Sequence, residues 1–101
     1  MDKDTAFTIA KKFIEYLKEK KYQIIDAYIF GSYAKGSFGE DSDIDLAVIL
    51  KTCKNTFDTQ VDLMKLRRNF DLRIEPHPFI EKDIIDNDPF LSEVIKTGIR
   101  I

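Results

Sequence analysis

The run Ile44–Leu50 (IDLAVIL) restricts the fold most, because six of its seven residues are apolar. A strand this uniformly apolar is typical of a central strand that is covered on both faces of a sheet. The segment before it is very different, since Gly31–Asp43 holds three of the four glycines of the chain together with serines and carboxylates. Long ordered connections in small domains tend to carry function. We therefore expect a buried strand with a functional loop leading into it.

The remaining segments have the apolar periodicities of helices and strands. The third strand is expected to stop at Pro76 and Pro78, which cannot donate to a ladder of hydrogen bonds. The helix of residues 57–69 is expected to bury its apolar side chains, which are Phe57, Val61, Met64 and Leu66. The expected elements are a helix over residues 5–21, strands over 22–30 and 44–50, a helix over 57–69, a strand over 70–75, a helical turn over 80–85 and a helix from Pro89 to Gly98.

The order αββαβα predicts one α/β (α+β) domain over residues 1–101, with a small mixed sheet that carries helices on one face. A content of 44% apolar and 34% charged residues is typical of a globular chain. The net charge of −2 argues against strong nonspecific binding to nucleic acid. No apolar run approaches the length of a membrane span, the N-terminus is unlike a secretory signal, and Cys53 is the one cysteine. These features favour the cytoplasm.

Carboxylates are the first candidate functional groups. Asp43 and Asp45 are two positions apart on the entry to a strand, so their side chains point to the same face. Two like charges this close repel unless a cation lies between them, and ligation by oxygen alone favours Mg²⁺ or Mn²⁺. Asp71, on the expected third strand, joins them if the two strands are neighbours. Three carboxylates can hold two divalent ions that activate an attacking oxygen and stabilise a leaving phosphate.

Two further residues near Asp71 carry side chains that suit such a site. Glu75 would share a strand face with Asp71 and is the rival for the third carboxylate. The interpretation preferred from the sequence is Asp71, with Glu75 left open. His77 lies between two prolines and is interpreted as a structural or surface residue rather than a catalytic one.

The glycine-rich loop is the second candidate. Gly31 follows a strand, so the chain can turn sharply there without a Cβ clash. If a helical turn opens at Ser32, its free N–H groups can hold phosphate oxygens, and Lys35 can neutralise a phosphate charge before Gly36 ends the turn. The loop and the carboxylates together suggest a triphosphate with metal ions.

The motif GSYAKGSFGEDSDIDL resembles the signature of the nucleotidyltransferase superfamily that includes polymerase beta and kanamycin nucleotidyltransferase. The segment FDLRIEP resembles the strand that carries the third metal-binding aspartate of polymerase beta. The size of the chain is similar to that of the minimal nucleotidyltransferase branch, which often has arginine where this chain has Lys35.

This resemblance implies a polymerase-beta-like palm and transfer of a nucleoside monophosphate from a triphosphate, with ATP the expected donor, to an acceptor hydroxyl. Gly31 and Ser32 would hold the β and γ phosphates. Asp43 and Asp45 would bind two Mg²⁺ ions, and Asp71 would bind the catalytic ion and help to deprotonate the acceptor.

The resemblance also implies a partner. Many members of this branch pair with a helical HEPN-type toxin and adenylylate one of its tyrosines, so this chain is expected to be the antitoxin. The alternative is a binding subunit with little turnover that neutralises its partner by forming a complex. An aminoglycoside-type small-molecule acceptor ranks lower. No membrane and no nucleic-acid substrate are expected, apart from tRNA or RNA bound to the toxin, and a homo-oligomer is left open.

Overall fold

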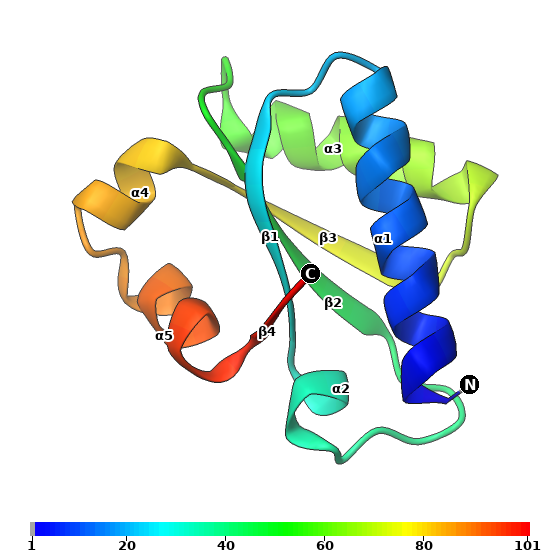
Figure 1. The fold of residues 1–101 in the computed structure, drawn as a ribbon. Helices are drawn as coiled ribbons and strands as arrows, with labels where there is room; N and C mark the ends of the chain where they lie inside the picture. Colours follow the sequence, from blue (N-terminus) through cyan, green and yellow to red (C-terminus); the bar gives the residue numbers. More distant parts are fainter. Residues whose placement is uncertain (1) are drawn as a thin grey trace.

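Four strands form one mixed sheet in the order β3-β2-β1-β4. The computed structural model describes residues 2–101. The strands are β1 (Ile24–Phe30), β2 (Ile44–Leu50), β3 (Ile74–Ile80) and β4 (Ile99–Arg100). β2 is central, antiparallel to β1 and parallel to β3, and β4 adds a short antiparallel edge beside β1 that the sequence did not predict. The predicted mixed α/β architecture with a central apolar strand is confirmed (Figure 1).

Capping side chains mark the starts of three helices. Side chains of Asp2, Asn55 and Asp88 each accept a hydrogen bond from a backbone N–H in the first turn that they precede. Within residues 2–101 no helix combines the length and the hydrophobicity needed to cross a bilayer. The helices are α1 (Lys3–Glu19), α2 (Ser32–Lys35), α3 (Thr56–Leu66), the 3₁₀ turn η1 (Arg67–Asn69), α4 (Glu81–Ile85) and α5 (Pro89–Thr97).

The main core lies between one face of the sheet and the helices α1 and α3. Alternate residues of β2 point into it, and the same cluster contains buried side chains of α1 and Leu63 of α3. The buried residues of β2 in this core are Ile44, Leu46, Val48 and Leu50. Because side chains alternate along a strand, Asp45, Ala47 and Ile49 must face the opposite side of the sheet.

The opposite face carries a smaller apolar layer. Ala47 and Ile49 are fully buried there, and Phe90 of α5 packs edge-on against Phe30 with ring centroids 5.6 Å apart. Figure 1 shows α4 and α5 on the side of the strands away from α1. The helices are thus shared between the two faces, and the expectation that all of them lie on one face is wrong. α5 covers only part of the second face, and the carboxylates lie where β2 begins.

The expected strand over residues 70–75 is wrong in position, since β3 begins at Ile74 and runs through both prolines to Ile80. Residues 70–73 form turns instead, in which the N–H groups of Phe70 and Asp71 donate to the Arg67 carbonyl. Proline is tolerated in β3 because β3 is the edge strand, where the missing N–H costs little on the outer side.

The buried side of α3 also differs from the expectation. Phe57 is 73% exposed and Val61 is also exposed, whereas Thr59 and Leu63 are the buried residues. α3 lies against β3 at the edge of the sheet, so the sheet covers only a narrow part of the helix. The apolar side chains of α3 therefore spread around more of the helix than the sheet can cover, and Phe57 and Val61 remain exposed.

Candidate functional site

Asp45 lies at the first pleat of the central strand, where three parts of the chain meet. In the strand register it is opposite Phe30, the last residue of β1, and opposite Glu75 near the start of β3. Its side chain is 32% exposed, on the face that α1 and α3 do not cover. The backbone of Asp45 is thus held in the central strand, while its carboxylate stays accessible at the surface.

Gly31 brings the loop directly against this carboxylate. Its backbone has φ 72° and ψ −145°, a conformation that residues other than glycine avoid. A Cβ atom at this position would overlap Oδ2 of Asp45 and would lie 3.3 Å from its Cγ. The close approach, and not only the turn, therefore requires glycine. This contact between Gly31 and Asp45 also joins the glycine-rich loop and the carboxylates into one site.

We expect Gly31→Ala to lower the free energy of unfolding by about 2–3 kcal/mol, because it adds both backbone strain and the clash with Asp45. Gly36→Ala is the matched control, since Gly36 also has a positive φ of 77° but has open space around its Cα. It should cost only about 1 kcal/mol. Urea denaturation measures both, and equal losses would show that the contact with Asp45 contributes nothing.

The loop after Gly31 forms the helical turn that the sequence predicted. α2 spans Ser32–Lys35, and Gly36 ends it in the left-handed conformation with its N–H donating to the Ser32 carbonyl. The first N–H groups of a helical turn have no acceptor inside the turn, so those of Ser32 and Tyr33 can serve a ligand. The side chain of Lys35 is exposed. The turn is anchored by Tyr33, which is fully buried and stacks on Phe38 at 4.6 Å.

The structure separates the two candidates for the third carboxylate. Glu75 is the direct register partner of Asp45 on the parallel strand β3, so both residues point to the same face. Asp71 lies before β3, in the turn that leads into it. The expectation that Asp71 lies on a strand beside Asp45 is wrong. Glu75, and not Asp71, is the strand residue next to Asp45. The Glu75 carboxylate accepts a hydrogen bond from Nη1 of Arg67 at 3.0 Å.

Asp71 is instead tied to Arg73. Its Oδ1 accepts from the Arg73 backbone N–H at 2.9 Å and from Nε at 2.8 Å, while Oδ2 accepts from Nη2 at 2.6 Å. These hydrogen bonds from the Arg73 side chain hold the pKa of the Asp71 carboxyl below its ordinary value. The arrangement is a local clamp that shapes the turn into β3.

His77 lies closer to the candidate site than the sequence suggested. Its Nε2 is 3.6 Å from Oδ1 of Asp45, and its ring packs edge-on against Phe30 with centroids 5.2 Å apart. Nε2 is buried and has no hydrogen-bond partner among residues 2–101. His77 is thus placed beside Asp45 as a polar neighbour.

The donor chemistry of these residues fits a hard divalent cation. Asp43, Asp45 and Glu75 offer only carboxylate oxygens, which Mg²⁺ and Mn²⁺ prefer, and they come from the same end of two adjacent strands. In the part of the chain that the structure describes, no three acidic, histidine or cysteine side chains already lie close enough to hold a metal ion. Asp43 is exposed and Glu75 is turned toward Arg67, so both side chains would have to converge on the cation.

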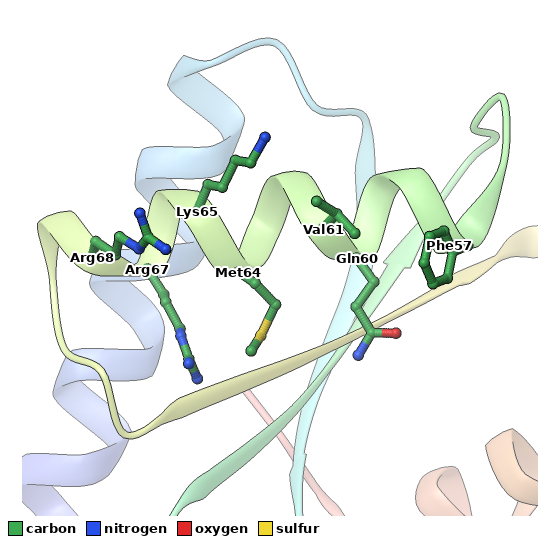
Figure 2. Close-up of a pocket in the computed structure, with 7 residues that line it drawn as sticks. All are labelled: Phe57, Gln60, Val61, Met64, Lys65, Arg67 and Arg68. Carbon is green, nitrogen blue, oxygen red and sulfur yellow. The ribbon is translucent and has the colours of Figure 1, made fainter.

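Hollows in the surface do not by themselves identify this site. A hollow of about 380 Å³ lies along α3, where Figure 2 shows Gln60, Met64 and Arg67 extending from the helix toward β3. No carboxylate lines it. A smaller hollow of about 220 Å³ includes Gly31 and Lys35 and lies between α2 and α5. The smaller hollow is therefore the one that adjoins the candidate site, through the loop residues Gly31 and Lys35.

The sequence contains a signal that places His77 on the same strand face as Glu75, but the predicted strand ended before it. Inward Ile74, Pro76 and Pro78 alternate with outward Glu75, His77 and Phe79, so the period of two continues through the prolines. The predicted stop at Pro76 hid this alternation. Phe90, which packs against Phe30 beside the same face, belongs to the helix that the sequence predicted from Pro89 to Gly98.

Known proteins are similar to this chain in sequence and in fold. The family described as "Polymerase beta, Nucleotidyltransferase" matches residues 11–101. A Methanocaldococcus jannaschii protein, provisionally named a protein adenylyltransferase, is 30% identical over 87 residues, which cover 84% of this chain and 83% of that protein. A crystal structure of a provisionally named nucleotidyltransferase from Sulfolobus solfataricus has the same fold, with a TM-score of 0.69 and 22% identity over 97% of this chain and 80% of its own.

Proposed function

Because this chain belongs to the polymerase beta nucleotidyltransferase family and is a nucleotidyltransferase, we propose that it transfers AMP from ATP to a hydroxyl group of a protein partner. The observation that carries the proposal is the contact of Gly31 with Asp45, which places a loop with free N–H groups beside a surface carboxylate. The name of the Methanocaldococcus jannaschii relative supports a protein as the acceptor.

The residues of the site divide into two groups. Gly31, Ser32, Lys35 and Gly36 would hold the triphosphate through backbone N–H groups and the Lys35 charge. Asp43, Asp45 and Glu75 would hold Mg²⁺, which when bound supplies positive charge for the phosphate oxygens and lowers the pKa of a coordinated hydroxyl. Asp71 is the alternative third carboxylate, and paired variants separate it from Glu75.

The transfer breaks one phosphorus–oxygen bond and forms another. The acceptor oxygen attacks the α phosphorus, the bond to the bridging oxygen of the β phosphate breaks, and pyrophosphate leaves. The hydroxyl proton passes to the third carboxylate, for which we assign Glu75. The task of the chain is mainly positioning, because the loop fixes the triphosphate and β2 fixes Asp45 beside it.

For the acceptor, the proposal is a tyrosine of a helical HEPN-type toxin, with this chain acting as the antitoxin. The resemblance of Gly31–Leu46 to the nucleotidyltransferase signature and the similarity of the chain to the minimal nucleotidyltransferase branch support this choice. Adding AMP to a tyrosine blocks its hydroxyl and introduces a negative charge, and both changes can inactivate a protein that uses that hydroxyl.

The test is incubation of the chain with its helical partner, Mg²⁺ and labelled ATP. Label at the α phosphate should appear on the partner, and label at the γ phosphate should not, because pyrophosphate leaves. Transfer of γ label would mean phosphorylation and would contradict the proposal. Label on an aminoglycoside, on tRNA or on the chain itself would keep the reaction class but overturn the acceptor.

A second candidate function is a binding subunit that neutralises a partner without turnover. It is favoured by the exposed apolar side chains of α3, where Phe57 and Val61 lie among basic residues in the hollow of Figure 2. Under this function, an Asp45→Asn variant neutralises the toxin as well as the unmodified chain does, whereas Phe57→Ala loses partner binding. Loss of neutralisation in Asp45→Asn alone would exclude it.

A further inference from the structure

A hollow beside the loop is lined by residues of the loop and by two phenylalanines. It has a volume of about 220 Å³, and its walls combine Gly31 and Lys35 of the candidate phosphate loop with Phe30 and Phe90. Three further residues of α5 complete the lining, which are Glu93, Val94 and Thr97. Pockets for whole ligands are usually about 300–1,000 Å³, so this one suits a single ring system rather than a complete nucleotide. Figure 1 places α5, which carries Phe90, next to α2.

Phe90 is both exposed and firmly held. The residue is 53% exposed, yet its ring centroid lies 5.6 Å from that of Phe30 at 90° and 5.8 Å from that of Phe79 at 26° between ring planes. The backbone is fixed as well, because Pro89 opens α5 and the Asp88 carboxylate accepts from the Leu91 N–H at 2.9 Å. A ring supported by aromatic neighbours offers its free surface with little loss of side-chain entropy on binding.

We infer that Phe90 is a stacking platform for the nucleobase of the nucleoside triphosphate, which enters the hollow between α5 and the Gly31–Gly36 loop. This inference rests on the proposed function, because the triphosphate on the loop is what brings a base to this hollow. Every base has an aromatic face, so stacking favours a nucleotide over a bare polyphosphate without selecting one base. The chemical class of the ligand is therefore a planar heteroaromatic ring joined to a triphosphate.

A structural role for Phe90 makes a different prediction. If the Phe90 ring only covers Phe30 and Phe79, its removal should loosen this face of the sheet. The binding of every ligand of the loop should then weaken to the same extent. Inorganic tripolyphosphate separates the two roles, because it can occupy the loop but has no base. The affinities of ATP and of tripolyphosphate are compared by calorimetry with Mg²⁺ and without any acceptor.

The expected result is that Phe90→Ala weakens ATP binding about tenfold and leaves tripolyphosphate binding unchanged. Phe90→Leu keeps an apolar cover over the sheet but has no aromatic face, so it should show the same loss if Phe90→Ala does not fold. Phe90→Tyr should bind ATP as the unmodified chain does. Ile85→Ala, which removes another exposed apolar side chain, is the matched control and should change neither affinity.

Equal weakening of both ligands, or no change for ATP in Phe90→Ala and Phe90→Leu, would overturn the stacking role and leave the proposed function standing. If the unmodified chain binds neither ATP nor tripolyphosphate, the proposed function itself fails. The two failures are thus distinguishable in one set of titrations.

Discussion

Asp45→Asn should reduce AMP transfer by about 10³-fold while leaving the fold intact. The substitution keeps the size and shape of the side chain beside Gly31 and removes the negative charge that would hold Mg²⁺. Because the carboxylate lies at the surface, the free energy of unfolding should change by only about 0.5 kcal/mol. Single-turnover labelling with α-labelled ATP measures the rate, and urea denaturation measures the stability.

Glu40→Gln is the matched control for this variant. It neutralises another exposed carboxylate on the same loop, outside the strand and away from the contact with Gly31. It should transfer AMP within about twofold of the unmodified chain. A transfer rate in Asp45→Asn close to that of Glu40→Gln would remove Asp45 from the reaction and leave the chain with a binding role only.

Glu75→Gln should reduce transfer by about 10²-fold, whereas Asp71→Asn should leave it within about threefold. The reason is the strand register, which places Glu75 and not Asp71 on the same face as Asp45. Both variants are compared in the same labelling assay at saturating ATP. The opposite pattern would restore Asp71 as the third carboxylate and would require the turn before β3 to move when the metal binds.

Arg67→Gln controls for the ion pair that Glu75→Gln also breaks. Arg67 donates to Glu75 and to the Ile74 carbonyl, so its loss should lower stability while the Glu75 carboxylate remains available. If Arg67→Gln reduced transfer as strongly as Glu75→Gln, the effect would come from the structure of the β3 edge and not from the lost carboxylate.

Asp71→Asn should show its effect on stability instead, with a defined dependence on pH. Because Arg73 lowers the pKa of folded Asp71, the ion pair stabilises the fold above the ordinary carboxyl pKa of about 4, and this contribution is lost as the pH falls through the lowered value. The variant should be less stable at pH 7, by under about 1 kcal/mol since Arg73 is partly exposed, and the difference should shrink below about pH 4. A constant difference across that range would mean that Asp71 acts through the shape of the turn alone.

Several parts of the fold could be predicted because they depend on short-range chemistry. The buried strand β2 is visible in its apolar run, the starts of α1, α3 and α5 in their capping residues, and the end of α2 in Gly36. Each of these depends on residues within a few positions, and backbone sterics and hydrogen bonding act on that scale.

The third strand and the exposed side of α3 could not be predicted in the same way. Whether proline ends a strand depends on whether the strand is at an edge, and whether Phe57 is buried depends on how much sheet lies beneath α3. Both are properties of the assembled sheet. The expected strand contained both Asp71 and Glu75, and only the observed register shows that Glu75 is the residue paired with Asp45.

By itself the sequence determined the chemistry of this protein: a glycine-rich turn, alternating aspartates and the apolar strand that holds them, all within one stretch of chain. The tertiary structure alone decided which distant groups join them. Parallel pairing of β3 with β2 brings Glu75 and His77 to Asp45, and the packing of α5 on the second face brings Phe90 to the loop. The physical reason is that a side chain's type is local, while its neighbours are set by strand order and helix packing across the whole domain.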